Sequence, residues 1–346
     1  MVELTSQPPP DWQGFARAHG EFYHDARWVC ALQRAFGYPM HYVTARRGGA
    51  VAGLLALAEV PALVGPRRLV SLPFSYAAGP LALDSEAGLA LQAAAIDRAC
   101  EIGARRIEIK QVLAVAPNPA PAYIRRTRYA AFRLATDGGE AAVLQRLHGD
   151  STRRGIRKAE RAGVQVRTGS ASSDWLIMAR LEEATARSHG VPAPPRRFFL
   201  DTCAALQTEG LAELYLAELP GDPNPLAAIV IWKGPRRWIY AFGASRPESL
   251  SVRPNHALLW SAIREAVQAG VEFDFGRAAP EQVGLVEFKR RWGGVEVPLA
   301  YDYWPDAAGL NTGNRSRGPL AWLAGVWSAL PAPVARVGSV LYRYLG

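Results

Sequence analysis

Residues 272–277 read Glu-Phe-Asp-Phe-Gly-Arg, and residues 287–294 read Glu-Phe-Lys-Arg-Arg-Trp-Gly-Gly. The first stretch alternates aromatic and polar residues and stops at Gly276, which predicts a short strand ending at a special backbone position. The second predicts a short helix that ends at the paired glycines. Packing alone explains poorly why Lys289 stands among aromatic residues in that helix. We therefore expect Asp274 and Lys289 to lie on neighbouring elements.

The composition is that of an ordinary globular protein of one large domain or two smaller ones. The chain has 346 residues, of which 49% are hydrophobic and 21% are charged. Its three cysteines are far apart and form no CxxC pair, which argues against a zinc site or a disulfide framework and fits a reducing compartment. The net charge of +9 attracts nucleic acid, phosphorylated substrates or anionic membranes, without choosing between them.

The sequence predicts a cytoplasmic protein. Residues 1–11 have neither a basic start nor an apolar core, so we expect no signal peptide. The longest internal apolar run, residues 51–65, is interrupted by Glu59 and Pro61 and is too short to span a bilayer.

The order of predicted elements repeats in the two halves of the chain. Each half has a strand hairpin, a third strand, a helix followed by glycine, and a short strand with a central acid, either Glu108 or Asp274. We favour an internal duplication of one α/β unit. The alternative is a chance similarity of two α/β halves. The strands are predicted at 41–45, 51–60, 68–73 and 106–111 and at 214–219, 226–233, 237–243 and 272–276, with helices at 26–36, 85–102 and 254–269.

A strongly basic helix is predicted over residues 150–163, with Asp150 or Ser151 as its cap and Gly163 at its end. Helical spacing places arginines 153, 157 and 161 on one stripe, with Arg154 and Lys158 beside it. Such a cluster is easiest to understand if it binds phosphates, although a solvated basic helix would look the same.

The chain after residue 319 predicts two short amphipathic helices around a Pro-Ala-Pro turn at 331–333. They either pack on the body of the protein or dock peripherally on a membrane surface, such as the inner membrane face. The predicted organisation is a first domain at 1–148, a second domain at 149–305 that opens with the basic helix, and C-terminal helices at 306–346.

Four ordered blocks of the sequence resemble FemAB-like transferases, within the acyltransferase superfamily of GNAT type. They are residues 151–164 around Arg-x-Ile-Arg-Lys-Ala, residues 253–260, residues 273–277 and residues 284–294. The match covers about Trp28 to Tyr303 and looks closest to the subgroup found with bacterial exopolysaccharide and PEP-CTERM sorting loci.

The resemblance implies a mixed α/β (α+β) chain with two tandem GNAT-type domains, and an enzyme that transfers an acyl group to an amine. The donor would be an aminoacyl-tRNA or an acyl-CoA, with no tightly bound cofactor and no metal. The acceptor would be an amine on a nucleotide- or lipid-linked cell-envelope precursor, of peptidoglycan or exopolysaccharide type.

Two departures from the family pattern bear on the donor. The coiled-coil arm of some members is absent, because residues 175–210 predict only ordinary helices, and this weakens the transfer of the tRNA-binding picture. No R/Q-x-x-G-x-G/A loop follows the strand at 237–243, where backbone amides would hold a CoA pyrophosphate, and this weakens the CoA interpretation.

Three residues are the catalytic candidates. Lys289 matches the family's helix lysine, to which stabilisation of the transition state is assigned; the alternative is a surface lysine beside two arginines. By resemblance, Glu108 in the first half contacts the acceptor and takes its proton. Asp274 is either a second catalytic acid or a cap of the turn around Gly276. No G-x-S-x-G elbow supports a serine triad.

The substrate-binding candidates are polar and aromatic residues near these positions. His256 is expected to be a polar cap at the start of a helix. The full set of binding candidates is Arg154, Arg157, Lys158, Tyr240, Asn255, Arg277, Phe288 and Tyr76.

Other activities remain open from the sequence. The nearest is an acyl-CoA-dependent N-acyltransferase that acts on a small amine. A non-catalytic binding protein of an exopolysaccharide assembly system is another, because tandem folds can keep their shape without chemistry. A plain RNA-binding protein would show salt-sensitive affinity and no acyl transfer.

Overall fold

The computed structural model describes residues 1–62, 65–305 and 338–344, and the chain in it divides into two compact units. Met1–Ala130 and the chain that returns from Val297 form the first unit, and Ala131–Glu296 form the core of the second. Of the predicted C-terminal helices, only a 3-10 helix, η6 (Gly338–Tyr344), lies within the described residues.

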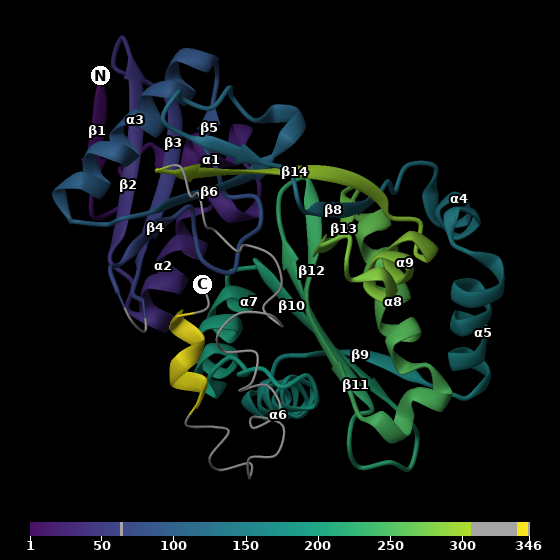
Figure 1. Ribbon diagram of the computed structural model, residues 1–346. Coiled ribbons are helices and arrows are strands. Elements are labelled where there is room, and N and C mark those ends of the chain that lie inside the picture. The colour runs from purple at the N-terminus through teal and green to yellow at the C-terminus, as the bar shows by residue number, and fades with distance from the viewer. Residues whose placement is uncertain (63–64, 306–337, 345–346) are drawn as a thin grey trace. The chain divides into compact units, whose positions relative to one another are not determined.

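The first unit is a mixed sheet in the order β1-β2-β3-β4-β6-β14 (Figure 1). Its helix α3 packs on one face, where Leu91 and Ala95 meet Leu69, Ile107 and Ile109 of the strands in a buried cluster. The elements are β1 (Val2–Thr5), α1 (Trp12–His19), η1 (Phe22–His24), α2 (Ala26–Phe36), β2 (Met40–Arg47), β3 (Ala50–Val60), β4 (Arg68–Val70), β5 (Leu81–Ala82), α3 (Ser85–Glu101), β6 (Ile107–Val112), η2 (Leu113–Val115), β7 (Ile124–Arg126) and β14 (Val295–Trp304).

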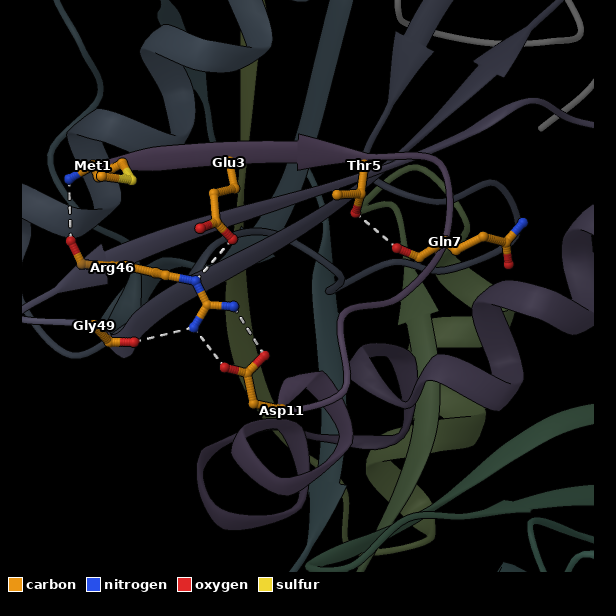
Figure 2. Close-up of polar contacts among 7 residues, drawn as sticks. All are labelled: Met1, Glu3, Thr5, Gln7, Asp11, Arg46 and Gly49. Carbon is orange, nitrogen blue, oxygen red and sulfur yellow. Dashed lines mark hydrogen bonds and ion pairs between the residues drawn. The ribbon is translucent and has the colours of Figure 1, made fainter.

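Arg46 ties the N-terminal strand to this sheet, as Figure 2 shows. Its guanidinium donates to Glu3 at 2.8 Å and to Asp11 at 2.5 Å, and its carbonyl oxygen accepts from the Met1 ammonium at 3.1 Å. β1 pairs antiparallel with β2 from Val2 to Thr5, so these contacts fix the edge of the sheet.

The second unit has the sheet order β8-β13-β12-β11-β10-β9. Its helices α6 and α8 cover opposite faces (Figure 1): Tyr215 donates to Glu265 of α8 at 2.7 Å, whereas the alternating Leu214 and Leu216 pack beside Asp174 of α6. The elements are β8 (Ala130–Leu134), α4 (Gly139–Arg146), η3 (Gly149–Arg153), α5 (Arg154–Arg161), β9 (Gln165–Gly169), α6 (Ser172–Ser188), η4 (Phe198–Cys203), α7 (Ala204–Thr208), β10 (Ala212–Glu218), β11 (Ala227–Lys233), β12 (Arg237–Ser245), η5 (Pro247–Val252), α8 (Pro254–Gln268), β13 (Glu272–Ala278) and α9 (Val283–Arg291).

The two sheets repeat the same strand order, so the predicted duplication and mixed α/β fold class are confirmed. Strands β1, β2, β3, β4 and β6 correspond to β9, β10, β11, β12 and β13, and α3 corresponds to α8. The sixth strand of each sheet comes from the other half of the sequence: β14, from the second half, pairs with β6 in the first unit, and β8, from the first half, lies beside β13 in the second. The units therefore divide at residues 130 and 296, which differs from the predicted boundaries after 148 and 305.

Local predictions held where capping signals were strong and failed in two places. Helices α2, α3 and α8 lie where expected, with Gly37, Gly103 and Gly270 in the left-handed region after them. The third strand ends at Val70 and not at residue 73, because the backbone turns there through Leu72 and Phe74, both with positive φ. The basic helix begins with a short π-helix, η3, whose N-cap is His148, so Asp150 and Ser151 are not its caps.

Candidate functional site

Both units contain a pair of parallel strands that pair over only a few residues. β12 and β13 pair only from Arg237 with Glu272 to Ile239 with Asp274, although β12 continues to Ser245 and β13 to Ala278. In the first unit, β4 and β6 pair at two positions, the last joining Val70 to Glu108. Asp274 and Glu108 thus occupy the last paired position of their strands, which confirms that the two acids are equivalent.

Asp274 stabilises the turn at the end of β13. It is fully buried, and its carboxylate accepts from the Gly276 backbone N–H at 2.7 Å and from the Arg133 guanidinium at 3.4 Å. Gly276 has φ of 74°, a conformation that other residues adopt only with strain. These contacts are those of the turn-capping role considered from the sequence.

Lys289 reaches from α9 to the same turn and is buried, so the surface-lysine interpretation is wrong. Lys289 is only 3% exposed, and its Nζ donates to the carbonyl oxygens of Gly276 at 2.9 Å and Arg277 at 2.8 Å. The ammonium lies 5.4 Å from the Phe132 ring centroid. Burial lowers the pKa of Lys289 to about 8, helped by the Arg277 charge and opposed by Asp274. A neutral amine retains two N–H donors, enough for both carbonyls.

The part of β12 beyond its pairing with β13 carries Tyr240 and a bulge. The register between β11 and β12 shifts between Val230 and Ile231, and the Tyr240 ring covers Gly243, where a Cβ would lie 1.8 Å from the phenol oxygen. Burial raises the pKa of Tyr240, and the carboxylate of Glu182 on α6 adds to this.

Glu182 is a titratable group that the sequence did not single out. Burial raises its pKa to about 7. In the described part of the chain it forms no hydrogen bond or ion pair. Residues 180–185 mix polar and apolar side chains, so the sequence gives no local sign that Glu182 is buried. The burial follows from the packing of α6 on β12.

A cavity of about 670 Å³ lies within the second unit, between the starts of α5, α8 and α9. It brings three predicted binding residues together: Arg154, Lys158 and Phe288. The other lining residues are Asp150, Ser151, Thr152, Gly155, Arg253, His256, Gly284, Glu287, Arg291 and Trp292.

The cavity has an excess of positive charge, because the cations Arg154, Lys158, Arg253 and Arg291 outnumber the acids Asp150 and Glu287 in its lining. Arg154, Lys158 and Arg253 form no ion pair within the described residues, whereas Arg291 is paired with Glu287 at 2.8 Å. Burial lowers the pKa of His256 to about 4, with a further contribution from Arg253, so the imidazole is neutral at physiological pH. Cations at the amino terminus of α8, together with the half-buried Phe288 ring, suit an anion attached to a planar group.

A close approach of two helices shapes this cavity. Gly155 of α5 lies against His256 of α8, and a Cβ at residue 155 would sit 2.2 Å from the imidazole Cδ2. The glycine inside the predicted basic helix was the available sequence signal for this contact. Arg253, which precedes α8, has φ of 60°, so the backbone at the cavity rim is strained.

The remaining predicted residues lie outside the cavity lining. Arg157 is exposed on α5, and Arg277 is exposed after the turn. Asn255 donates to Ser245 at 3.3 Å, and its buried carbonyl oxygen has no partner among the described residues. Glu108 and Tyr76 belong to the first unit, where Tyr76 is buried edge-on against Tyr23.

The described ranges contain neither a metal-binding group of side chains nor a helix suited to cross a membrane. Across residues 1–62, 65–305 and 338–344, no three His, Cys, Asp or Glu side chains are grouped to hold a metal ion. No helix in these ranges combines the length and apolarity needed to cross a bilayer.

Comparison with known proteins identifies the domain type. Residues 148–290 match the acetyltransferase (GNAT) domain family, and a search of curated proteins found no match. Among solved structures, FemX aligns over 87% of this chain and 96% of its own, with a TM-score of 0.66 and 17% identity. L-PGS from Bacillus licheniformis aligns over 97% and 98%, with a TM-score of 0.58 and 13% identity.

A third similar structure is a tandem GNAT protein from the clavulanic acid biosynthesis pathway. It aligns over 88% of this chain and 98% of its own, with a TM-score of 0.55 and 14% identity. Since these identities are low, the likenesses establish the fold. The chain therefore has a tandem GNAT-type fold, and its residues 148–290 match the acetyltransferase (GNAT) domain family.

Proposed function

We propose that this protein is a FemAB-like N-acyltransferase that moves an aminoacyl group from aminoacyl-tRNA to the amine of a cell-envelope precursor of peptidoglycan or exopolysaccharide type. The observation that carries the proposal is the cavity in the GNAT domain, with three cations that form no ion pair among the described residues and the half-buried ring of Phe288. Phosphate oxygens would neutralise Arg154, Lys158 and Arg253, and a nucleotide base would stack on the half-buried Phe288 ring.

The positive charge continues beyond the cavity along α5. Arg157 and Arg161 are exposed and unpaired among the described residues. A nucleic acid has phosphates to place on this stripe, whereas a single pyrophosphate would end inside the cavity. This continuity favours an RNA-borne donor. The similarity to FemX and to L-PGS supports an aminoacyl transfer of this kind.

The proposed reaction is attack of a neutral amine on the donor's carbonyl carbon. The amine loses a proton, the new amide bond forms, and the ester oxygen of the RNA ribose leaves with a proton. Glu108 is the proposed acceptor of the amine's proton. Lys289 donates to the carbonyl oxygens of Gly276 and Arg277. Its proposed contribution is therefore to hold the end of β13 in position and to place the positive charge of its ammonium beside the reacting carbonyl.

A second donor class is supported by a separate observation. The cavity lies at the amino terminus of α8, the first α-helix after β12, where a helix dipole favours a pyrophosphate. An acyl-CoA would place its diphosphate there. In this chain η5 and Arg253 occupy the connection, so side-chain cations would replace a glycine-rich loop.

The deciding experiment compares transfer from charged tRNA and from acetyl-CoA, in wild type and in an Arg157→Gln/Arg161→Gln variant. With an RNA donor, the variant weakens use of charged tRNA, and the slope of log affinity against log salt becomes shallower by about 0.7–0.9 per lost phosphate contact. Use of acetyl-CoA with an unaffected variant would reject the aminoacyl-tRNA proposal. Mass spectrometry of envelope precursors from a deletion strain then identifies the acceptor through one missing acyl increment.

A further inference from the structure

On the face of the first sheet opposite α3, Glu108 lies beside the buried Val70, its partner on β4, and near several polar residues. Alternation along β4 and β6 turns Leu69, Ile107 and Ile109 into the core under α3. The residues between them lie on the other face: Arg68, Arg106 and Glu108, together with Tyr303, which pairs with Glu108 across β14. We call this set the Glu108 face.

The groups on the Glu108 face are close to one another but leave Glu108 without a partner. The Arg106 guanidinium lies 5.2 Å from the Tyr303 ring centroid. Glu108 is half-buried and forms no hydrogen bond or ion pair in the described ranges. Burial lowers the pKa of Arg68, while the nearby Glu108 and the phenol of Tyr38 favour its charged form. In the strand register Arg68 lies two residues before Val70, the partner of Glu108, so Arg68 and Glu108 share one face of the sheet.

The C-terminal end of the chain is bound at this face by its backbone. The Tyr38 hydroxyl donates to the carbonyl oxygen of Arg343 at 2.6 Å. Arg68 donates to the carbonyl oxygen of the next residue, Tyr344, at 3.2 Å. Tyr38 is fully buried, so its hydroxyl has a fixed position. Two side chains thus bind two successive peptide carbonyls, a pattern that recognises backbone and not side-chain identity.

We propose that Tyr38 and Arg68 form a peptide-backbone subsite beside Glu108, that the chain's own residues 343–344 occupy it, and that a peptide or amide group of the acceptor takes their place. The last part rests on the proposed function, which makes the Glu108 face the acceptor side. The consequence is self-occupancy: residues 343–344 must leave before an acceptor amide binds, and binding of the acceptor releases them.

The test uses the 346-residue chain and carboxypeptidase Y, a broad-specificity exopeptidase that must remove Gly346 and Leu345 before it reaches Tyr344. Release of Tyr344 requires cleavage of the bond whose carbonyl Tyr38 holds. Tyr38→Phe removes one hydrogen bond, so we expect Tyr344 to be released about three- to tenfold faster than in wild type, followed by intact mass. Tyr42→Phe is the matched control, because the buried Tyr42 hydroxyl contacts the Cys30 sulfur at 3.5 Å and not the C-terminus.

A second arm tests the ligand class with N-acetyl-alanyl-alanine amide. A tethered segment competes at an effective concentration of about millimolar, so the dipeptide amide is used at about tens of millimolar. We expect it to speed the release of Tyr344 from wild type and to have no further effect on Tyr38→Phe. Equal rates for wild type and Tyr38→Phe, or no effect of the dipeptide amide, would overturn the proposal. Neither readout involves acyl transfer, so failure here and failure of the proposed function are separable.

Discussion

The buried lysine of the second unit gives a pH dependence that can be measured without knowing the substrate. Its pKa is about 8 in the folded chain, against an ordinary value of 10.5. Between these two values the unfolded chain binds more protons at this residue than the folded chain does. The free energy of unfolding therefore rises with pH across this window, on account of Lys289. The difference of about 2.5 pH units corresponds to about 3 kcal/mol at 1.36 kcal/mol per unit.

The experiment compares wild type with Lys289→Met by urea denaturation at several pH values from 7 to 10.5. Methionine keeps the length of the side chain but cannot titrate, so all other titrating groups cancel in the difference between the two proteins. We expect wild type to gain about 3 kcal/mol relative to the variant as the pH rises through the window.

An exposed arginine on the same helix provides the control. Arg290→Met removes a neighbouring cation that pairs with Glu296 at the surface, and its difference from wild type should change little over this range. A difference between wild type and Lys289→Met that stays flat from pH 7 to 10.5 would refute the reasoning. It would mean that Lys289 is solvated and that its two carbonyl contacts do not persist.

Three further changes test the packing and the ion pairs. Gly155→Ala should lower stability and abolish anion binding in the cavity, although alanine normally favours a helix by about 1 kcal/mol; Gly14→Ala, with open space around it, is the matched control in urea denaturation. Asp302→Asn should cost about 3–5 kcal/mol in the same assay, because Asp302 is fully buried against its guanidinium partner; a loss below about 1 kcal/mol would contradict this. Arg46→Met should lower the melting temperature at neutral pH. The hydrogen bond from Arg46 lowers the pKa of Asp11, so the difference in melting temperature between wild type and Arg46→Met should shrink as the pH falls through that lowered pKa. A difference that does not change with pH would contradict this contribution of the ion pair.

Local signals in the sequence were enough to predict the repeated unit. Helices α3 and α8 end near Gly103 and Gly270, and the acids of β6 and β13 follow each helix at similar spacing. Such features depend on residues close in the chain, where capping and alternation act directly.

The buried state of Lys289 and the site around it depend on contacts between distant residues. Two arginines follow Lys289, which suggests a solvated face, but Phe132 and the carbonyl of Gly276 approach it from two strands. The cavity likewise forms where α5 meets α8, over one hundred residues later in the chain. No periodicity within one segment reports such a meeting. The roles of Glu108 and Lys289 in chemistry therefore stay predictions until transfer is assayed.

The exchanged sixth strands have a consequence for synthesis on the ribosome. The first unit cannot complete its sheet when its own 130 residues have emerged, because β14 begins only at Val295. Until then β6 exposes an unpaired edge, and Gln111 and Arg125 lack their later partner Asp302. Domains usually mature one after another as the nascent chain lengthens. Here the N-terminal half must wait for the C-terminal half, so a chaperone or the ribosome surface has an incomplete sheet to shield for most of translation.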